Sequence, residues 1–205
     1  MAIIKMIKNP PKTKSNLKKL MNYITQPAKT RPDLVGGFNC DWENAYDEFT
    51  HTKKDFDKED GIQARHMVMS FDVNDDVTVE SAKQIGDELL QHKLFENFQV
   101  VYAVHKDKDH VHIHFCINSV NLENGKRWHQ TSADLKSLKL RSNDLCRKYN
   151  LSEIELNQDK GSRTDSEIKN RFESWKYELY LAAVNSSRRA SSIDEFKFVM
   201  NELGY

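Results

Sequence analysis

Four of the eight histidines in this 205-residue chain lie within one short stretch, VHKDKDHVHIHFCIN. His110, His112 and His114 alternate with apolar residues, so a β-strand would turn all three imidazoles to one face. His105 stands one short turn earlier, at the end of another apolar run. Neutral imidazole binds Mn²⁺, Zn²⁺, Ni²⁺ or Cu²⁺, and three ligands from two neighbouring strands leave coordination positions open. The spacing predicts a divalent metal site formed by two of the alternating histidines and a third ligand from the adjacent strand, although a cluster of surface histidines fits the same pattern.

A tyrosine is the second candidate for chemistry. The helix expected from Ser15 has one apolar face, made by Leu17, Leu20, Met21 and Ile24. Tyr23 projects about 110–120° away from that face. A tyrosine hydroxyl is a weak nucleophile unless a base or a cation helps to remove its proton, and a metal ion can stabilise charge on a phosphate. Tyr23 and a histidine-bound metal would together suffice for phosphoryl transfer, although an ordinary surface tyrosine fits this position as well.

Strand and helix patterns alternate along the segments that must position these residues. Strands are predicted at residues 2–7, 63–71, 98–105 and 110–118, the last two as a β-hairpin. Helices are predicted to begin at Ser15, near residue 43, at Thr78 and at Ser132, with a loop at Gly36-Gly37. Thr164 with Glu167 and Ser192 with Glu195 are capping-box patterns that predict two further helices. We therefore expect an α+β domain with an antiparallel sheet and flanking helices in residues 1–158, followed by a helical extension in residues 159–205.

The charge of the chain is balanced overall but uneven along its length. The 31 Lys and Arg residues match the 31 Asp and Glu residues, which argues against a protein that coats DNA non-specifically. Residues 1–32 nevertheless hold eight basic and no acidic side chains, residues 41–60 hold eight acidic ones, and residues 126–148 hold seven basic ones. Each block fits a solvated helix face, whereas two basic blocks that converge on one cleft would follow a phosphate backbone. We expect any DNA-binding face to be local, with the acidic helix turned away from it.

The cysteines and apolar runs indicate a cytoplasmic protein without membrane insertion. Cys40, Cys116 and Cys146 are odd in number and widely spaced, so they predict neither a disulfide framework nor a zinc knuckle. The N-terminal segment has no apolar run long enough for a signal peptide, and the longest apolar runs are only strand-sized.

Three segments, taken in order, resemble the motifs of a conjugative relaxase: MNYITQPAKT, ARHMVMSF and VHKDKDHVHIHFCINSVN. The chain is similar to the VirD2-like mobilisation relaxases of the MOBP group, especially those on mobile elements of Gram-positive bacteria. These belong to the HUH endonucleases, named for a His–hydrophobic–His pair that is His112-Ile113-His114 in this sequence. The resemblance covers roughly residues 3–156 and implies the HUH relaxase fold, with its palm-like sheet.

The resemblance also implies an activity and a set of roles. Such enzymes nick one DNA strand at the origin of transfer of a plasmid or integrative element, and Tyr23 matches the tyrosine that becomes linked to the 5′-phosphate. His105, His112 and His114 match the metal-binding triad. His110, Asp107 and Asp109 match positions that orient ligands or transfer protons. Ser70 matches a residue that holds the DNA near the nick, and the candidate DNA contacts also include Lys29, His66, Lys126 and Arg127.

The implied cofactor is a divalent metal ion, with Mn²⁺ favoured by imidazole ligands and Mg²⁺ or another divalent ion as alternatives. The implied partners are single-stranded origin-of-transfer DNA, accessory relaxosome proteins and a coupling protein.

Three other interpretations remain open. A rolling-circle replication initiator shares the histidine pair and the tyrosine, but it usually carries the tyrosine after the histidines, whereas Tyr23 precedes them. A hydrolase of small phosphoesters would form no covalent adduct with DNA. A non-catalytic DNA-binding accessory protein with a structural metal would not depend on Tyr23 at all.

Overall fold

The computed structural model describes residues 2–107, 109–154 and 192–203, together with residues 179, 182, 183, 186, 187 and 190. The chain forms two compact units, Met1–Glu155 and Leu156–Tyr205. Within the described residues, no helix combines the length and the apolar character that crossing a membrane would require.

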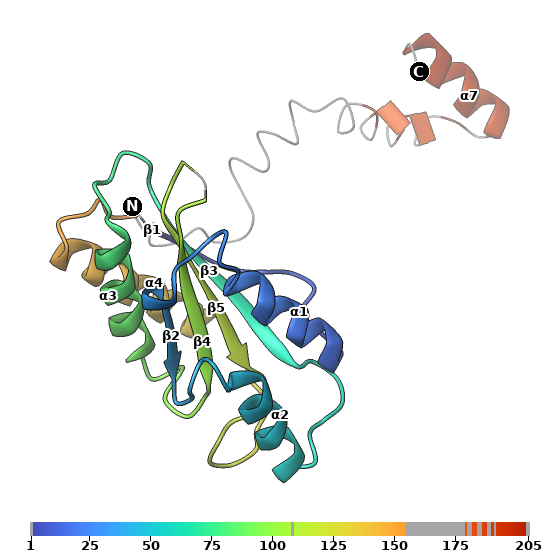
Figure 1. Cartoon of the computed structure of the whole chain (residues 1–205). Coiled ribbons are helices and arrows are strands. Elements are labelled where there is room, and N and C mark those ends of the chain that lie inside the picture. Colours follow the sequence, from blue (N-terminus) through green and yellow to red (C-terminus); the bar gives the residue numbers. More distant parts are fainter. Residues whose placement is uncertain are drawn as a thin grey trace. The chain divides into compact units, whose positions relative to one another are not determined.

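A five-stranded antiparallel sheet forms the centre of the first unit (Figure 1). Its strands are β1 (Ala2–Met6), β2 (Val35–Phe38), β3 (Ala64–Phe71), β4 (Val100–His105) and β5 (His112–Asn118), in the spatial order β1-β3-β5-β4-β2. The central strand β5 pairs with β4 as the predicted hairpin, which sets His105 opposite His112. The predicted α+β fold, an antiparallel sheet flanked by helices, is confirmed.

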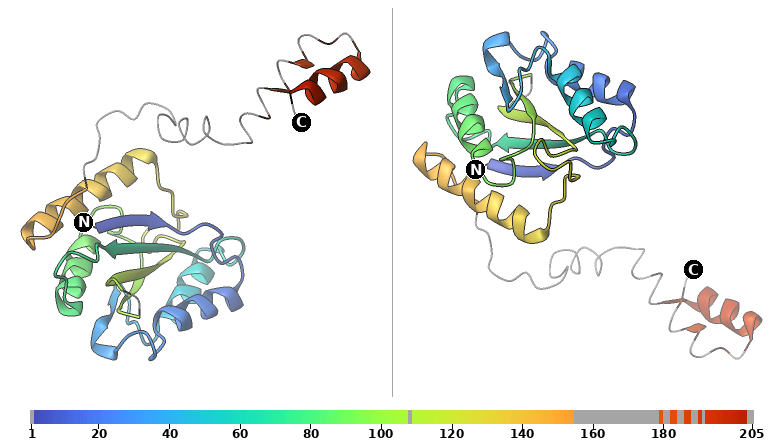
Figure 2. Two further views of the ribbon diagram at one scale, coloured as in Figure 1. Left: turned by 90° about the horizontal axis from the view of Figure 1, so that it is seen from above. Right: turned by 90° about the horizontal axis from the view of Figure 1, so that it is seen from below.

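Helices cover both faces of this sheet (Figure 2). On one face lie α1 (Lys14–Ile24) and α2 (Ala45–Asp55), and on the other lie α3 (Val79–Leu90) and α4 (Ser132–Lys148). Because strand side chains alternate, Phe115 points into the core under α3 and α4, whereas Cys116 points into the core under α1 and α2. His112 and His114 have the same parity as Cys116. The histidines therefore lie on the face that carries α1.

The acidic segment forms α2, beside α1 on the same face of the sheet. The buried ammonium of Lys53 in α2 donates to the side-chain oxygen of Asn118, 2.6 Å away, at the end of β5. The acidic helix is therefore not on the opposite face from the histidines. It lies at the opposite end of the same face.

Two helices begin one or two residues earlier than expected. The N-cap of α1 is Thr13 rather than Ser15, and that of α4 is Thr131 rather than Ser132. Thr131 and Asp134 form a reciprocal capping box, because each side chain accepts a hydrogen bond from the other residue's backbone N–H. Thr78 caps α3 as predicted.

In the second unit, α7 (Ile193–Glu202) is capped by Ser192, as predicted. The helix predicted at Thr164 and Glu167 lies outside the described residues.

Two predictions about strands were wrong. Gly36-Gly37 was expected as a loop but belongs to β2, where Gly36 pairs with Tyr102. A side chain at Gly36 would overlap the Tyr102 ring, so this glycine allows the two strands to approach. The strand expected from residue 110 begins at His112, which leaves His110 in the turn.

The two hydroxyl side chains at the start of α4 allow a direct test of the cap. Thr131→Ala is expected to lower the free energy of unfolding by about 1 kcal/mol, because it leaves a helix N–H without its acceptor. Ser132→Ala should change it by less than about 0.5 kcal/mol, because position 132 supplies no cap. Urea unfolding of both variants measures the difference, and a larger loss for Ser132→Ala would contradict the cap assignment.

Candidate active site at the histidine cluster

Three buried histidines meet at one end of the central hairpin. His105 ends β4 opposite His112, and His114 follows two residues later on the same face of β5. One ring nitrogen of each can be chosen so that all three lie within 4.8 Å of one another. The predicted convergence of ligands from two strands is therefore present.

Two of these rings keep one nitrogen hydrogen-bonded and the other unpartnered. Nε2 of His105 donates to the carbonyl oxygen of Ile24, 2.7 Å away, and Nδ1 has no hydrogen-bond partner among the described residues. Nδ1 of His114 lies 2.8 Å from Nε2 of His66, and Nε2 of His114 is likewise unpartnered. Buried polar atoms without partners are unfavourable in a finished fold. When Nδ1 of His114 donates to His66, both unpartnered nitrogens carry lone pairs, and their convergence fits the donor set of a divalent metal ion.

The third ring supports the same conclusion and brings Asp107 into the cluster. Nδ1 of His112 donates to the carbonyl oxygen of His110, 3.2 Å away, so Nε2 carries a lone pair. This Nε2 atom lies 3.5 Å from Oδ1 of Asp107, and Oδ2 of Asp107 lies 3.3 Å from Nζ of Lys29. A lone pair and a carboxylate oxygen repel each other unless a cation or a proton lies near both. Asp109, in contrast, is exposed, and no described residue forms an ion pair or hydrogen bond with its side chain.

Burial keeps this cluster uncharged. Desolvation, together with the neighbouring His105 ring, lowers the pKa of His114 to about 3 and that of His66 to about 4. The pKa values of His105 and His112 are also lowered by desolvation. Neutral imidazole is the form that binds metal ions, so the site is ready to accept one near neutral pH.

Tyr23 lies beside the histidines in the last turn of α1, with 42% of its surface exposed. Its ring centroid is 5.6 Å from that of His114 and 6.3 Å from that of His105. Nζ of Lys29 lies 4.2 Å from the centroid of the Tyr23 ring. Partial desolvation acts to lower the pKa of Lys29, but Tyr23 and Asp107 beside it raise that pKa overall. The tyrosine is therefore open to solvent, adjacent to the proposed ligands and next to a fixed positive charge.

The end of α1 is tied to the histidine cluster through the backbone. The last carbonyl groups of an α-helix have no partners within the helix, and the carbonyl of Ile24 is one of them. His105 supplies its donor, as described above. The residue after the nucleophile candidate is thus bonded directly to a ligand candidate, which couples the position of Tyr23 to the orientation of His105.

The other predicted site residues lie at different distances from the histidine cluster. Ser70 lies on β3 directly opposite His112 and shares the face of the histidines. His66, predicted as a DNA contact, is instead hydrogen-bonded to His114. The alternation of β3 indicates that His66 and Ser70 share a face. Only the register between β3 and β5 reveals that His66 reaches His114.

Lys126 and Arg127 do not join the cluster. Arg127 pairs with Val120, beyond the far end of β5, so the whole strand separates it from His112. Its guanidinium donates to the backbone carbonyls of Lys58, Asp60 and Ile62, which attaches one loop to another. Arg127 therefore makes structural contacts away from the histidine cluster, and its role as a DNA contact stays a prediction.

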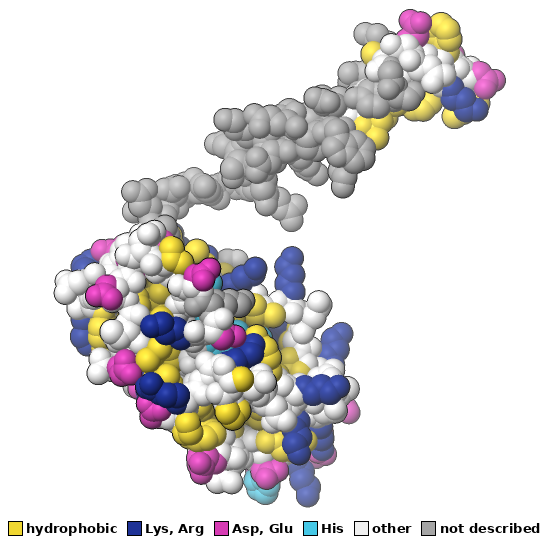
Figure 3. All heavy atoms as spheres, turned by 45° about the horizontal axis from the view of Figure 1, so that its top comes forward, with side chains coloured by type: hydrophobic (Ala, Val, Ile, Leu, Met, Phe, Trp, Pro, Cys, Tyr) yellow, Lys and Arg dark blue, Asp and Glu magenta, His cyan; other side chains and the backbone are white. Residues whose placement is uncertain are grey.

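The two basic blocks also do not converge. Basic side chains gather along the side of the unit that carries α1 (Figure 3), whereas the second block lies largely on α4, across the sheet. On α4, Arg147 is paired with Glu153 at 2.7 Å and Lys148 with Glu88 at 2.6 Å. The second basic block therefore adds no positive charge beside Tyr23.

Sequence comparisons bear on this site. A family model described as "Relaxase: MobA/VirD2-like, nuclease domain" matches residues 23–151, which include Tyr23 and the three histidines. Protein rlx of Staphylococcus aureus is 36% identical over 181 residues, which cover 86% of this chain and 57% of that protein. The group II intron-interrupted relaxase LtrB of Lactococcus lactis subsp. cremoris is 30% identical over 141 residues, covering 55% of this chain and 25% of that protein. This chain thus spans little more than half of the rlx protein and a quarter of LtrB.

Solved structures of another relaxase have the same fold. The Mn-bound MobM relaxase domain (MOBV) with plasmid pMV158 oriT DNA matches with a TM-score of 0.53 at 15% identity, covering 82% of this chain and 97% of that chain. A second MobM structure, bound to 26-nucleotide oriT DNA, matches with a TM-score of 0.52 at 15% identity and covers 82% of this chain and 98% of that one. At this identity, the likeness concerns the fold.

Metal-free protein should lose stability as the pH falls from about 6.5 to about 4. The folded pKa values of His66 (about 4) and His114 (about 3) lie below the ordinary histidine value of 6.5, so the unfolded chain takes up protons first. Stability is complete above that ordinary value and falls by up to about 1.4 kcal/mol per pH unit for each such histidine. Urea unfolding in a chelator at several pH values measures this slope. His66→Gln should flatten it, and an unchanged slope in that variant would contradict the buried neutral cluster.

Proposed function

The chain belongs to the MobA/VirD2-like relaxases, and on that premise we propose that it nicks one DNA strand at the origin of transfer of a mobile element. One observation carries the proposal: an exposed tyrosine lies 5.6 Å, ring to ring, from a buried histidine whose free nitrogen points into a three-histidine cluster. A nucleophile next to metal-binding side chains is what the attack of a protein hydroxyl on a DNA phosphodiester requires.

Three side chains of this cluster would hold the metal ion: His105, His112 and His114. When bound, the ion would polarise a non-bridging phosphate oxygen of the DNA. We propose Mn²⁺, because imidazole ligands suit it better than Mg²⁺, which prefers oxygen. His66 would orient His114 by hydrogen bonding, a role that replaces the DNA contact expected for it.

Tyr23 would supply the attacking oxygen. The bond between its Oη and the phosphorus forms, the bond to the 3′ oxygen breaks, and the products are a 5′-phosphotyrosyl link and a free 3′-OH. Tyr23 loses its hydroxyl proton, and the leaving 3′ oxygen takes up one proton. The total charge therefore does not change. Lys29, beside the ring, stabilises the phenolate electrostatically and is in reach of a DNA phosphate. The new ester conserves the energy of the phosphodiester, so the strand can be rejoined without ATP.

The remaining residues of the cluster would position this pair. Asp107 holds Lys29 on one side and faces His112 on the other, and His110 fixes the His112 ring through its backbone carbonyl. Ser70, opposite His112, would contact the DNA strand near the nick.

The wider setting is also proposed. Residues 1–158 would form the nuclease domain and residues 159–205 a helical extension. The protein would act in the cytoplasm on single-stranded origin DNA, with accessory relaxosome proteins and a coupling protein.

Tyr23→Phe is expected to abolish the covalent protein–DNA adduct, a loss of roughly a thousandfold or more, because it removes the attacking oxygen. Tyr46→Phe, which alters a partly exposed tyrosine on α2, is the matched control and should leave the adduct unchanged. The measurement is the shifted band in a denaturing gel after incubation with single-stranded origin DNA and Mn²⁺. An adduct formed by Tyr23→Phe would refute the assignment.

The metal site can be tested without any DNA. His114→Ala should abolish Mn²⁺ binding measured by isothermal titration calorimetry, because it removes a ligand. His66→Gln should weaken binding about tenfold to a hundredfold, because it alters only the support of that ligand. His92→Ala is the control, since His92 is hydrogen-bonded to Ser137 and lies outside the cluster. Equal binding by wild type and His114→Ala would contradict the proposed ligand set.

A further inference from the structure

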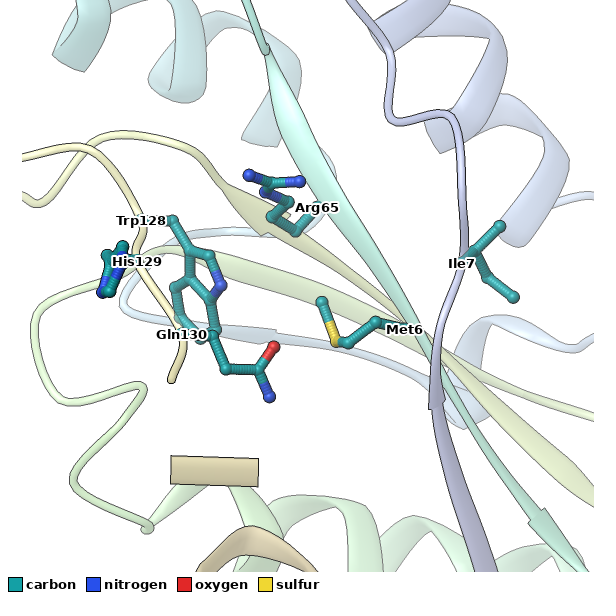
Figure 4. A pocket seen from close by; sticks show the side chains of 6 residues that line it. All are labelled: Met6, Ile7, Arg65, Trp128, His129 and Gln130. Atoms are coloured by element: carbon teal, nitrogen blue, oxygen red, sulfur yellow. The ribbon is translucent and has the colours of Figure 1, made fainter. Parts of the chain in front are cut away.

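A pocket of about 200 Å³ lies at the far end of the sheet from the histidines (Figure 4). It is lined by Met6, Ile7, Arg65, Trp128, His129 and Gln130. Met6 and Arg65 share the parity of Met67 on paired strands, so they face the α3–α4 side of the sheet. Arg65 lies five residues before Ser70, roughly 17 Å along β3. The pocket therefore lies on the face of the sheet opposite the histidines, although Arg65 directly precedes His66 in β3.

One wall of this pocket is already fixed. Trp128 is only 6% exposed, and its ring centroid lies 4.8 Å from that of Phe98 and 5.7 Å from that of Phe95. Its backbone N–H donates to the carbonyl of Ser119, 2.8 Å away. The Thr131 capping box holds the chain immediately beyond Gln130. A ligand would meet a preformed wall and would not have to order it.

Two polar groups of the pocket have no hydrogen-bond partner among the described residues. Nε2 of Gln130 is buried without a hydrogen-bond acceptor, although an amide nitrogen can donate two bonds. No described residue forms an ion pair or hydrogen bond with the Arg65 guanidinium, and no acidic side chain lines the pocket. In Figure 4, Gln130 and Met6 extend toward each other beside the Trp128 ring, and Arg65 lies on the other side of that ring. The pocket thus combines apolar surface with two hydrogen-bond donors, Gln130 and Arg65, that are free to bind an acceptor on a ligand.

We propose that this pocket binds one unpaired base of the DNA strand, together with a phosphate next to it. The inference rests on the proposed function, because it assumes that the ligand is a DNA strand. The apolar surfaces of Met6 and Trp128 suit a flat base, and a carboxamide such as that of Gln130 recognises base edges, adenine above all. The guanidinium of Arg65 suits the phosphate.

The edge strand β1 connects the pocket to the active-site face. Ile3, 54% exposed, lies opposite Ser70, and Ile7 lies just beyond the other end of β1, in the wall of the pocket. Both are large apolar side chains left exposed at this edge of the sheet, Ile3 on the strand and Ile7 just after it, where natural proteins usually place charges. A strand held near Ser70 can therefore cross this edge and place a base beside Gln130.

The test measures binding alone. In a Tyr23→Phe background without metal, fluorescence anisotropy compares a labelled oligodeoxyadenosine of about twelve nucleotides with an abasic oligomer of the same length. Gln130→Ala should weaken binding of the base-bearing oligomer about fivefold and leave the abasic oligomer unchanged. Arg65→Gln should weaken both, because both oligomers carry the phosphate.

Arg141→Gln is the matched control, because it removes the same charge from a half-buried arginine outside the pocket. Arg141 lies on α4 and donates to the carbonyl of Glu88 in α3. Circular dichroism melting of each variant verifies folding. An equal loss for both oligomers in Gln130→Ala, or no loss beyond that of Arg141→Gln in either pocket variant, would overturn the proposal. The adduct assay separates the two ideas: wild type without an adduct but with a Gln130-dependent base preference would refute the function and keep the pocket.

Discussion

The hydrogen bond from His105 to the carbonyl of Ile24 is the interaction on which the rest of the site depends. It closes the open end of α1, fixes the proton of His105 on Nε2 and leaves Nδ1 free, all through one 2.7 Å contact. Because Ile24 directly follows Tyr23, the same contact holds the nucleophile candidate over the cluster. Helix packing alone would place Tyr23 only to within the freedom of a last turn, which frays easily. Bonding that turn to a ligand candidate removes this freedom.

Two buried polar clusters on one face of the sheet differ in how far their polar atoms find partners. At the far end of β5, Lys53, Asn118, Gln99 and Thr52 form a network in which their side-chain donors and acceptors find partners. Desolvation lowers the pKa of Lys53 to about 8, yet the network is closed and needs nothing further. At the near end, His105 and His114 each keep a buried nitrogen without a partner. The histidine cluster is therefore the one of the two that has donor atoms free for a ligand.

Local patterns predicted the parts of this site that depend on periodicity. Alternation along β5 put His112 and His114 on one face, and helical spacing put Tyr23 off the apolar face of α1. What the sequence could not reveal depends on long-range pairing. The hydrogen bond between His66 and His114 requires the β3–β5 register, and β2 exists because Gly36 fits against Tyr102, 66 residues later. The charge blocks predicted the surface around the site least well. The sheet separates α4 from α1, and Arg127 is hydrogen-bonded to backbone carbonyls.

The charges of the site also fit the reaction. The four histidines are neutral by burial, and Asp107 and Lys29 cancel each other as an ion pair at 3.3 Å. The cluster therefore presents no net charge of its own, and a divalent ion held there would keep its whole charge of +2. A phosphodiester under attack by a phenolate carries a total charge of −2, one from each group. A carboxylate in place of one imidazole would reduce the attraction between site and transition state, whereas a triad of neutral rings leaves it undiminished.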